Sequence, residues 1–411
     1  MSEFLTGLTC VECGAGYAAE ARSICDECFG PLHPAYDLEA VRAKVSRQDV
    51  EHGPPSLWRY QALLPATRDP MVDLGDGLTP LRKAERLGAE LGLPNLYVKD
   101  DTRNPTHSFK DRVVSVALTK AREFGYDTVA CASTGNLANA TAAHAAAAGL
   151  GAVALVPAGL EAGKLAATAV YGATLIEVDG TYDDVNRLCG EAAPELPWAF
   201  VNVNLRPYYA EGSKTIGFET AEQLGWRAPD HVVVPIASGA LLTRIAHSFR
   251  ELHEAGFLDD EPHVRASGAQ AAGCAPVSTA FEQGAEEIRP VRYPDTVATS
   301  LAIGDPADGY YALQEIRRSG GAAATVDEDD IVEAVGLLAR TEGIFTETAG
   351  GVTIGALSHL AARGVIRPDE TVVVYVTGMG LKTLEAFGER YRPAAAISPK
   401  LEALIEAVGA R

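Results

Sequence analysis

The sequence predicts an α/β fold in which helices cover both faces of parallel β-sheets, with a small cysteine-rich module ahead of them. From about Asn95 onward, short apolar runs rich in valine and isoleucine alternate with segments of helical pattern. Continuous apolar runs of this length are typical of strands buried on both faces of a parallel sheet. The chain has 411 residues, which is enough for two or three domains with sizeable cores.

The individual elements follow from these runs in chain order. Strands are predicted at 96–101, 128–133, 152–158, 173–179, 231–237 and 371–378. Helices are predicted at 108–124, 136–149 and 241–252. Because parallel sheets bind their ligands at the carboxyl ends of the strands, we expect the functional residues in the loops that follow each strand.

The composition excludes two classes of partner. The formal net charge is -20 and the pI is near 4.9, whereas nucleic acids and anionic membranes attract a basic surface. The first eight residues lack the basic and apolar regions of a signal peptide, and no apolar run reaches the roughly 18 residues of a membrane span. We therefore expect a cytoplasmic protein that binds neither nucleic acid nor membrane.

The first 35 residues form a separate unit around two Cys-x-x-Cys pairs, Cys10 with Cys13 and Cys25 with Cys28. Each such turn can point two sulfurs at one ion, and two turns complete a tetrahedral zinc site. The gap between the pairs is shorter than the usual zinc spacing of about 15–20 residues, and free or disulfide-paired thiols are the alternative. We favour a structural zinc, because so short a segment has too small a core to fold alone.

The other three of the seven cysteines lie in segments predicted as core or helix. We expect Cys131, Cys189 and Cys274 to be small buried apolar side chains. An odd cysteine count without a secretory signal fits a reducing compartment.

A lysine follows the first predicted strand, in the segment NPTHSFKDR at residues 104–112. Ser108 suits a helix N-cap, and Asp111 completes a pair that resembles a capping box, so Lys110 falls in the first helical turn. The positive end of the helix dipole and partial burial both lower the pKa of a lysine there. Lys110 is therefore a candidate nucleophile for a Schiff base, and a solvated lysine on a helix face is the alternative.

The second loop, ASTGNLANA at residues 132–140, also joins a strand to a helix. The hydroxyls of Ser133 and Thr134 and the free amides around Gly135 and Asn136 can cradle an anion such as a carboxylate. Simple capping of the helix is the alternative.

Two further loops follow strands. PIASGALLT, residues 235–243, has Gly239 in its turn and backbone amides that can hold a phosphate, although it is not a Walker sequence. VTGMGLKT, residues 376–383, places the neutral hydroxyl of Thr377 at a strand end, or else is a structural turn.

Taken together, these loops resemble one family. The order NPT-x-SFKDR, STGN, a small-residue loop and TG-x-GLK is similar to that of the threonine synthases, which are tryptophan-synthase-β-like, fold-type II pyridoxal-phosphate enzymes. The resemblance runs from about Trp58 to about Lys382, roughly four fifths of the chain. It implies two doubly wound parallel-sheet domains with pyridoxal 5'-phosphate in the cleft between them. A cysteine-rich ribbon ahead of the catalytic core also occurs in this family.

This resemblance divides the chain into four parts. We expect a zinc-ribbon-like module at 1–35, an N-terminal extension with the first part of the large cofactor domain at 36–120, the small domain at 121–205, and the remainder of the large domain at 206–411.

The resemblance also implies roles for the matching residues. Lys110 would hold the cofactor as a Schiff base and move protons after substrate displaces it, and Phe109 would pack near the cofactor ring. Asn136 would bond the phenolic oxygen of the cofactor. Thr377 would face the pyridine nitrogen and leave it largely neutral, which makes a milder electron sink. The cofactor phosphate would be bound by Ala237, Ser238, Gly239, Ala240 and Leu241, and the substrate carboxylate by Ser133, Thr134, Gly135 and Asn136.

Several positions depart from the family pattern. His107 stands where a glycine is usual, as a proton shuttle or as a turn residue. Leu137 replaces a hydroxyl residue, and the phosphate loop reads ASGAL. Counting back from EGSKT, the arginine that binds substrate phosphate in the family falls at Tyr209. Arg206 lies three residues earlier, and we predict that it binds this phosphate, with an ion-paired surface arginine as the alternative.

The activity implied by the resemblance is that of a carbon-oxygen lyase, which converts O-phospho-L-homoserine and water to L-threonine and phosphate. Leu137 and Tyr209 keep a rival reaction open, the β-replacement of an activated serine such as O-phosphoserine, for example with sulfite to give cysteate. A third hypothesis is a non-catalytic protein whose ribbon docks a partner. We expect a small phosphorylated amino acid as substrate and a homodimer as the assembly.

Overall fold

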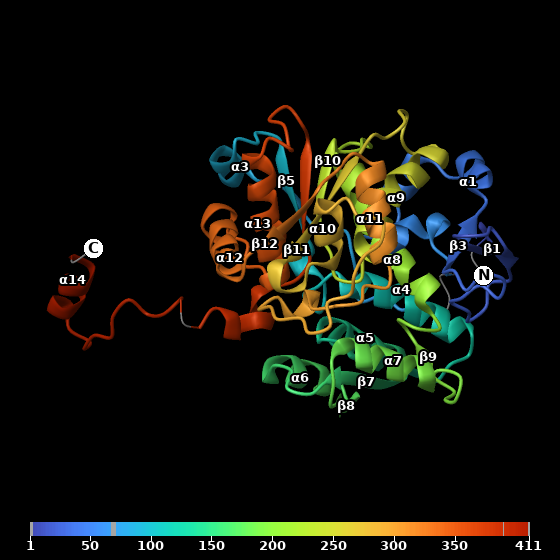
Figure 1. Cartoon of the computed structure of the whole chain (residues 1–411), viewed down its shortest axis with the longest axis horizontal. Helices are drawn as coiled ribbons and strands as arrows, with labels where there is room; N and C mark the ends of the chain where they lie inside the picture. Colours follow the sequence, from blue (N-terminus) through green and yellow to red (C-terminus); the bar gives the residue numbers. More distant parts are fainter. Residues whose placement is uncertain (1–2, 67–70, 389, 410–411) are drawn as a thin grey trace.

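The structure is a computed structural model that describes residues 3–66, 71–388 and 390–409. Its strands form three sheets, two of them largely parallel and covered by helices (Figure 1). The predicted α/β fold is therefore confirmed. Every strand and helix predicted above is present, with ends within two residues of those expected. The domain boundaries and the homodimer stay predictions, because a single chain tests neither.

The larger sheet has six strands in the order β12-β11-β10-β13-β5-β4, and only the edge strand β4 runs antiparallel to its neighbour. Its central strands β10 and β13 are buried at every residue, which explains their unbroken runs of valine. The strands are β4 (Leu81–Lys83), β5 (Leu96–Asp100), β10 (His231–Pro235), β11 (Arg265–Ala271), β12 (Ala323–Val326) and β13 (Val372–Val376).

The smaller parallel sheet has the order β8-β7-β6-β9 and lies apart from the larger one, at the bottom of Figure 1. Its strands are β6 (Thr128–Ala132), β7 (Gly151–Pro157), β8 (Thr174–Val178) and β9 (Ala199–Phe200). Helices α5 (Asn136–Ala148), α6 (Ala162–Ala169) and α7 (Tyr182–Ala192) accompany this sheet. Thr181 and Asp184 form a capping box that begins α7.

The third sheet is antiparallel and small, with β1 (Leu5–Cys10) between β2 (Gly16–Tyr17) and β3 (Leu32–Tyr36). It packs against α8 (Arg206–Gln223). The hydroxyl of Tyr36 donates to Glu211 at 2.7 Å, and the hydroxyl of Tyr208 donates to the carbonyl of Glu20 at 2.7 Å.

The remaining helices surround the two parallel sheets. They are α1 (Leu38–Lys44), α2 (Arg47–Glu51), α3 (Glu85–Leu91), α4 (Lys110–Glu123), α9 (Ala240–Glu254), α10 (Pro276–Glu282), α11 (Gly309–Arg318), α12 (Glu328–Glu342), α13 (Thr348–Ala362) and α14 (Leu401–Gly409). Short 3-10 helices are η1 (Leu57–Leu63), η2 (Asp101–Arg103), η3 (Ala272–Cys274), η4 (Thr299–Leu301) and η5 (Gly380–Ala386).

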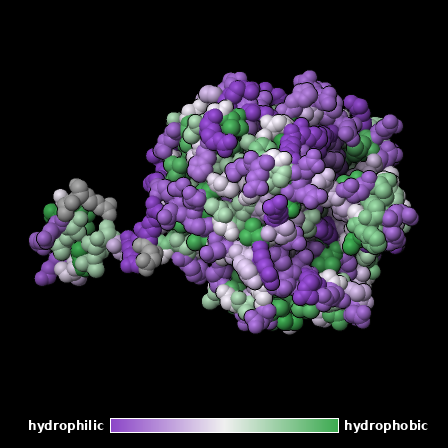
Figure 2. All heavy atoms as spheres, in the orientation of Figure 1, coloured by the Kyte–Doolittle hydropathy of each residue, from purple (hydrophilic) through white to green (hydrophobic). Residues whose placement is uncertain are grey.

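Helix α14 stands away from the body of the molecule at the end of an extended segment, and Figure 2 shows apolar side chains on its surface. Among the helices of the described ranges, none has the length and apolarity needed to cross a membrane.

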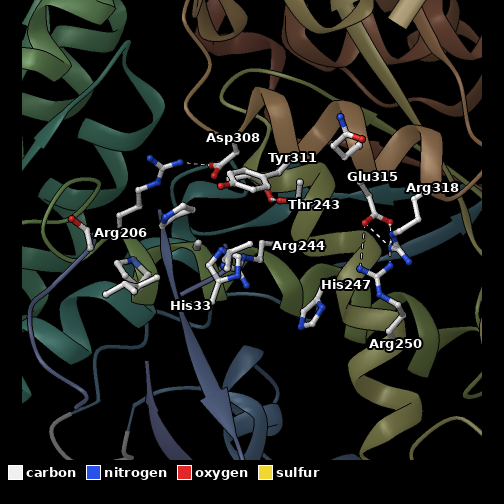
Figure 3. Close-up of a pocket in the computed structure, with 18 residues that line it drawn as sticks. His33, Arg206, Thr243, Arg244, His247, Arg250, Asp308, Tyr311, Glu315 and Arg318 are labelled. Carbon is white, nitrogen blue, oxygen red and sulfur yellow. Dashed lines mark hydrogen bonds and ion pairs between the residues drawn. The ribbon is translucent and has the colours of Figure 1, made fainter. Parts of the chain in front are cut away.

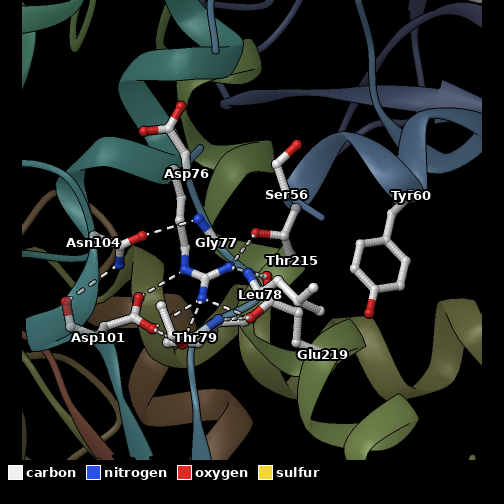
Figure 4. A network of polar contacts seen from close by, with 12 residues as sticks. Ser56, Tyr60, Asp76, Gly77, Leu78, Thr79, Asp101, Asn104, Thr215 and Glu219 are labelled. Carbon is white, nitrogen blue, oxygen red and sulfur yellow. Dashed lines mark hydrogen bonds and ion pairs between the residues drawn. The ribbon is translucent and has the colours of Figure 1, made fainter. Parts of the chain in front are cut away.

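A buried network of charges ties α4 to its neighbours (Figure 4). The guanidinium of Arg112 donates from Nε to Asp101 at 2.7 Å and from Nη2 to Glu219 at 2.8 Å, and all three side chains are fully buried. Glu219 also accepts a hydrogen bond from Lys99 at 2.7 Å. Burial alone would raise the pKa of Glu219, but Arg112 and Lys99 lower it to about 2. The network therefore joins β5, α4 and α8 through paired charges.

We expect Arg112→Met to lower the free energy of unfolding by about 3–5 kcal/mol, because it leaves buried carboxylates facing Lys99 alone. Urea denaturation followed by circular dichroism measures this loss. Arg363→Met is the control, since Arg363 is exposed after α13 and its replacement should change stability by less than about 0.5 kcal/mol. Equal stability of the two variants would contradict the assignment.

Candidate active site

The four predicted loops come together in one pocket. Ala132, Pro235 and Thr377 line it from the carboxyl ends of β6, β10 and β13. This is the edge at which parallel sheets bind ligands. Gly135 begins α5 between two lining residues but does not itself line the pocket. The other predicted site residues that line it are Phe109, Lys110, Ser133, Thr134, Asn136, Arg206, Ala237, Ser238, Gly239, Ala240 and Leu241.

Lys110 is the first residue of α4, as its predicted place in the first turn requires, but the predicted cap is wrong. Phe109 occupies the N-cap position, and no side chain caps this helix. Asp111 instead accepts hydrogen bonds from the backbone N and Oγ1 of Thr106, at 2.8 and 2.7 Å. Ser108 therefore plays no part in capping.

The start of α4 is fixed by a segment remote in sequence. The backbone N–H of Phe109 donates to the carbonyl of Thr377 at 2.9 Å, and Ser108 pairs with Gly378 as an isolated β-bridge. The lysine loop and the Thr377 loop thus hold each other in place, and Lys110 and Thr377 face the same pocket.

The amine of Lys110 lies in surroundings suited to a nucleophile. Its Nζ donates to the hydroxyl of Tyr209 at 2.9 Å and lies 4.4 Å from the ring centre of Phe109. Burial lowers the pKa of Lys110 to about 8, against the opposing charge of Glu347. A substantial fraction of this amine is therefore neutral at a pH near 8, whereas an ordinary lysine is almost fully protonated.

The start of α5 forms a second wall of the pocket. The hydroxyl oxygen of Ser133 accepts hydrogen bonds from the amides of Gly135 and Ala138, both at 2.9 Å, so it caps the helix as the alternative above supposed. Gly135 has φ +126°, and a Cβ there would lie 2.5 Å from the side chain of Lys164. The amide nitrogen of Asn136 donates to the carboxylate of Glu347 at 3.0 and 3.1 Å. Its amide oxygen is buried without a partner among the described residues.

The loop before α9 offers its backbone rather than its side chains. Gly239 has φ +94°, and a Cβ there would lie 2.5 Å from the carbonyl oxygen of Asp308. A side chain at this position would therefore be both strained and obstructed. Residues 237–241 line the pocket up to the first turn of α9, where free amides favour an anion.

Two residues of the site escaped prediction as partners of the lysine. Glu347 is 1% exposed, lines the pocket just before α13 and raises the pKa of Lys110. Tyr209 was noted only as a departure, yet its hydroxyl is the hydrogen-bond partner of Lys110. A sequence signal existed for Glu347, since a lone acid directly before the small-residue helix TAGGVTIGAL is unusual.

Arg206 lies at the border of this pocket, as the first residue of α8. Its Nη2 is 2.6 Å from Oδ2 of Asp308, and its side chain is about one third exposed (Figure 3). Arg206 is therefore ion-paired and also faces the pocket, and its binding of a substrate phosphate stays a prediction. Among the described residues that line the pocket, Arg206 and Lys110 are the two with cationic side chains.

His107, which replaces the usual glycine, has a left-handed backbone with φ 62°. Its side chain is exposed, is not part of the pocket lining and has Nδ1 3.4 Å from the carbonyl of Thr102. A glycine adopts this backbone without strain, which explains the family's preference at this position.

We expect His107→Gly to raise the free energy of unfolding by about 0.5–1 kcal/mol, because left-handed strain in histidine exceeds the entropic cost of glycine. Turnover should be unchanged. Arg103→Gly is the control in the same loop, where helical backbone makes glycine destabilising by a similar amount. A large loss of kcat in His107→Gly would instead identify the imidazole as a proton shuttle.

The four N-terminal cysteines converge, with all four Sγ atoms within 4.8 Å of one another. Cys10 and Cys28 are 3.4 Å apart and Cys13 and Cys25 are 3.6 Å apart between sulfurs, with no disulfide. Zinc-sulfur bonds of about 2.3 Å place sulfurs about 3.8 Å apart in a tetrahedron, so the cluster fits a metal. The three other cysteines are buried, as predicted.

A second group, Asp76, Asp111 and His144, also has side chains that can bind metals. His144 uses both ring nitrogens, Nε2 to Asp76 at 2.8 Å and Nδ1 to the carbonyl of Ala140 at 2.9 Å. Burial lowers the pKa of His144, but Asp76 raises it to about 9 overall. A doubly donating imidazolium has no lone pair for a metal, so this group is an ion-paired link between α5 and α4.

Comparison with known proteins identifies the family. The family described as "Pyridoxal-phosphate dependent enzyme" matches residues 72–378. A protein named threonine synthase from Methanosarcina acetivorans is 40% identical over 403 residues, which is 98% of each chain. Another of that name, from Methanocaldococcus jannaschii, is 40% identical over 92% of this chain and 93% of its own.

The chain belongs to the threonine synthase family of pyridoxal-phosphate dependent enzymes.

More distant members of the same fold are known as structures. Maize serine racemase superposes with a TM-score of 0.62 at 20% identity, covering 76% of this chain and 91% of that chain. Diaminopropionate ammonia lyase from Escherichia coli superposes with a TM-score of 0.64 at 19% identity, covering 77% and 88%. At these identities the likeness concerns the fold, and members of the threonine synthase family share it with enzymes of other substrates.

Proposed function

We propose that the protein converts O-phospho-L-homoserine and water to L-threonine and phosphate, with pyridoxal phosphate on Lys110. The observation that carries this proposal is the pairing of two cations in one pocket. Lys110 is half-buried with a lowered pKa, and Arg206 faces the same space from the start of α8. The amine of Lys110, when neutral, can form a Schiff base with the cofactor carbonyl, and the guanidinium of Arg206 suits the phosphate of a substrate. The family relatives that cover nearly the whole chain support the reaction.

The pocket fits pyridoxal phosphate. Oδ1 of Asn136 and Oγ of Ser300 both lie in residues that line it and have no hydrogen-bond partner among the described residues, which suits a polar ligand. Lys110 would hold the cofactor carbonyl, and the amides of residues 237–241 its phosphate. Phe109 would pack on its ring. Asn136 would hydrogen-bond the phenolic oxygen of the cofactor, and Thr377 would face its ring nitrogen.

The bound cofactor withdraws electrons from the substrate's α-carbon, so that neighbouring C–H bonds become acidic. Lys110, once displaced by the substrate, takes the α-proton on Nζ. Tyr209 holds Nζ at 2.9 Å and so orients the amine toward the pocket. A β-proton is then lost, phosphate leaves the γ-carbon, and the hydroxyl of water adds at the β-carbon. The γ-carbon and the α-carbon each regain one proton and the released phosphate takes the third, which accounts for the two protons removed and the one from water.

The substrate is bound at its two charged ends. Its carboxylate meets the first turn of α5, where Thr134 and Asn136 line the pocket and the helix N-terminus favours an anion. Its phosphate meets Arg206, which must exchange Asp308 for the incoming group.

The reaction is tested by incubating the purified holoenzyme with O-phospho-L-homoserine and identifying the amino acid formed. We expect threonine and phosphate in equal amounts. A parallel incubation with O-phosphoserine and sulfite tests the β-replacement, and cysteate formed in place of threonine would overturn the proposal.

We also place a structural zinc on Cys10, Cys13, Cys25 and Cys28. The N-terminal sheet contacts α8 through Tyr36 and Tyr208, so loss of the metal should loosen this face and leave the Lys110 pocket intact.

Cys25→Ser should remove one zinc per chain and lower the midpoint of thermal unfolding, while the folded protein still binds its cofactor. Metal analysis of protein purified without chelators and the absorbance of the cofactor measure the two effects. Cys189→Ser is the control, since that buried thiol lies outside the cluster. Wild-type protein without zinc would contradict the metal assignment.

A further inference from the structure

A second cavity of about 260 Å³ lies between the N-terminal sheet and the helices α8, α9 and α11 (Figure 3). It is next to the Lys110 pocket, because Arg206, Ala210, Ala240 and Asp308 line both. The role proposed for Lys110 and its cofactor makes no use of this space.

The charge of the cavity is opposite to that of the protein. Four arginines line it, against the carboxylates of Asp308 and Glu315, although the whole chain carries a net charge of -20. The arginines are Arg206, Arg244, Arg250 and Arg318. Such a local excess of guanidinium groups in an acidic protein favours an anionic ligand.

The existing ion pairs leave this excess in place. Arg250 and Arg318 share the one carboxylate of Glu315, at 3.1 and 2.6 Å. Arg244 pairs with Glu211 at 2.9 Å, and Lys214 pairs with both Glu211 and Glu251, so two carboxylates face these two cations. The single carboxylate of Glu315 between Arg250 and Arg318 therefore leaves one positive charge in the lining of the cavity.

The pKa values of two histidines respond to this positive charge. His33, which is half-buried, and His247, which is exposed, both line the cavity. Burial lowers the pKa of each imidazole, and the charge of Arg244 lowers it further. Both shifts favour the neutral imidazole, which can hydrogen-bond a ligand without adding charge.

Apolar side chains form another part of the wall. Val11, Pro31 and Leu32 line it from the N-terminal sheet, and Pro207 and Ala210 from α8. A cavity of this volume whose wall has cationic and apolar parts matches a small organic molecule that carries a single dianionic group. A guanidinium binds phosphate through two parallel hydrogen bonds, which makes phosphate the dianion that this wall suits best.

We infer that this cavity is a second binding site for a small phosphate monoester, and that its occupancy is felt in the active site through Arg206. The second half of this inference rests on the proposed function, since it requires Arg206 to bind the substrate phosphate. A ligand in the cavity competes for the same guanidinium, so it raises KM for the phosphorylated substrate and leaves kcat unchanged.

The site is tested by isothermal titration calorimetry on the holoenzyme with glycerol 3-phosphate, inorganic phosphate and glycerol as probes. We expect binding of glycerol 3-phosphate, weaker binding of phosphate and none of glycerol. Equal affinity for inorganic phosphate and glycerol 3-phosphate would overturn the inference that the ligand has an organic part.

Two variants locate the binding. Arg250→Gln removes one guanidinium and leaves Arg318 on Glu315, and Gln314→Glu adds a carboxylate to the lining without removing an ion pair. Each variant should weaken the binding of glycerol 3-phosphate by at least about tenfold, which is the equivalent of one charge-assisted hydrogen bond. Arg363→Gln, outside the cavity, should bind as wild type. Wild-type affinity in both cavity variants would overturn the site.

Kinetics separate this site from the active site. Glycerol 3-phosphate should raise KM in wild type. In Arg250→Gln, at least about a tenfold higher concentration of the ligand should be needed for the same rise in KM. Without the ligand, KM and kcat of Arg250→Gln should match those of wild type. Equal inhibition of both proteins would place the ligand in the active site and overturn the inference.

Calorimetry needs no turnover, so variant-sensitive binding without threonine formation would refute the proposed function alone. Threonine formation without such binding would refute this inference alone.

Discussion

Lys110→Ala should lower kcat for threonine formation by at least about 10³-fold, because the same amine anchors the cofactor and carries the α-proton. Lys110→Arg should be equally inactive, although it keeps the positive charge and much of the side-chain length. Its guanidinium stays protonated at all working pH values and cannot attack a carbonyl. The measurement is the rate of threonine formation with saturating pyridoxal phosphate, on protein whose circular dichroism matches wild type.

Borohydride reduction provides the independent check. It should fix the cofactor of the wild-type holoenzyme to the one peptide that contains Lys110. The four buried lysines are all held in ion pairs, which are Lys99 with Glu219 at 2.7 Å, Lys120 with Glu123 at 2.6 Å, Lys164 with Glu161 at 3.0 Å and Lys214 with Glu251 at 2.9 Å. Labelling on any of these would overturn the assignment of the site.

Arg206→Lys should lower kcat/KM for O-phospho-L-homoserine by at least about tenfold, since charge-assisted hydrogen bonds contribute about 1.5–3 kcal/mol each. The planar guanidinium can hold a phosphate through two parallel hydrogen bonds, which an ammonium group cannot reproduce. Tyr209, at the family's arginine position, is neutral and already bonded to Lys110. Steady-state kinetics over a range of substrate concentrations measure the effect.

Asp308→Asn is the matched variant. It removes the negative charge of the carboxylate whose Oδ2 lies 2.6 Å from Nη2 of Arg206 and which competes with the substrate phosphate for this guanidinium. We expect it to lower KM for the phosphorylated substrate, the opposite direction to Arg206→Lys. If Arg206 serves only as the structural partner of Asp308, both variants will lose stability and neither will change kcat/KM. That outcome would favour a substrate with a smaller or uncharged leaving group.

The local pattern of the sequence was sufficient for the elements that carry the site. The valine runs of β10 and β13 predicted buried strands, and the loops that follow β6, β10 and β13 do meet in one pocket. This works because a parallel sheet aligns the carboxyl ends of all its strands, so strand order need not be known. Strand β11, RASGAQA, was not predicted, because its small residues lack strand preference. There Gly268 leaves room for the side chains of Ile236 and Ile316.

The start of α4 shows where local rules stop. Ser108 and Asp111 have the spacing of a capping pair, but hydrogen bonds to the Thr377 segment set the backbone before the helix and leave Phe109 at the cap. A contact between residues so far apart in the chain has no trace in a local pattern. It outweighs a cap because α4 and β13 are both buried and cannot move independently.

The sequence by itself therefore determined the fold class, the place of Lys110 and of the helix N-termini beside one pocket, and the cysteine cluster, since each depends on residue types a few positions apart. Only the tertiary structure decided which side chains surround Lys110. Tyr209 and Glu347 reach it from α8 and from the segment before α13, and Asp308 reaches Arg206 from the start of α11. These pairings depend on how separate helices pack against the sheets, and burial in that packing lowers the pKa of Lys110.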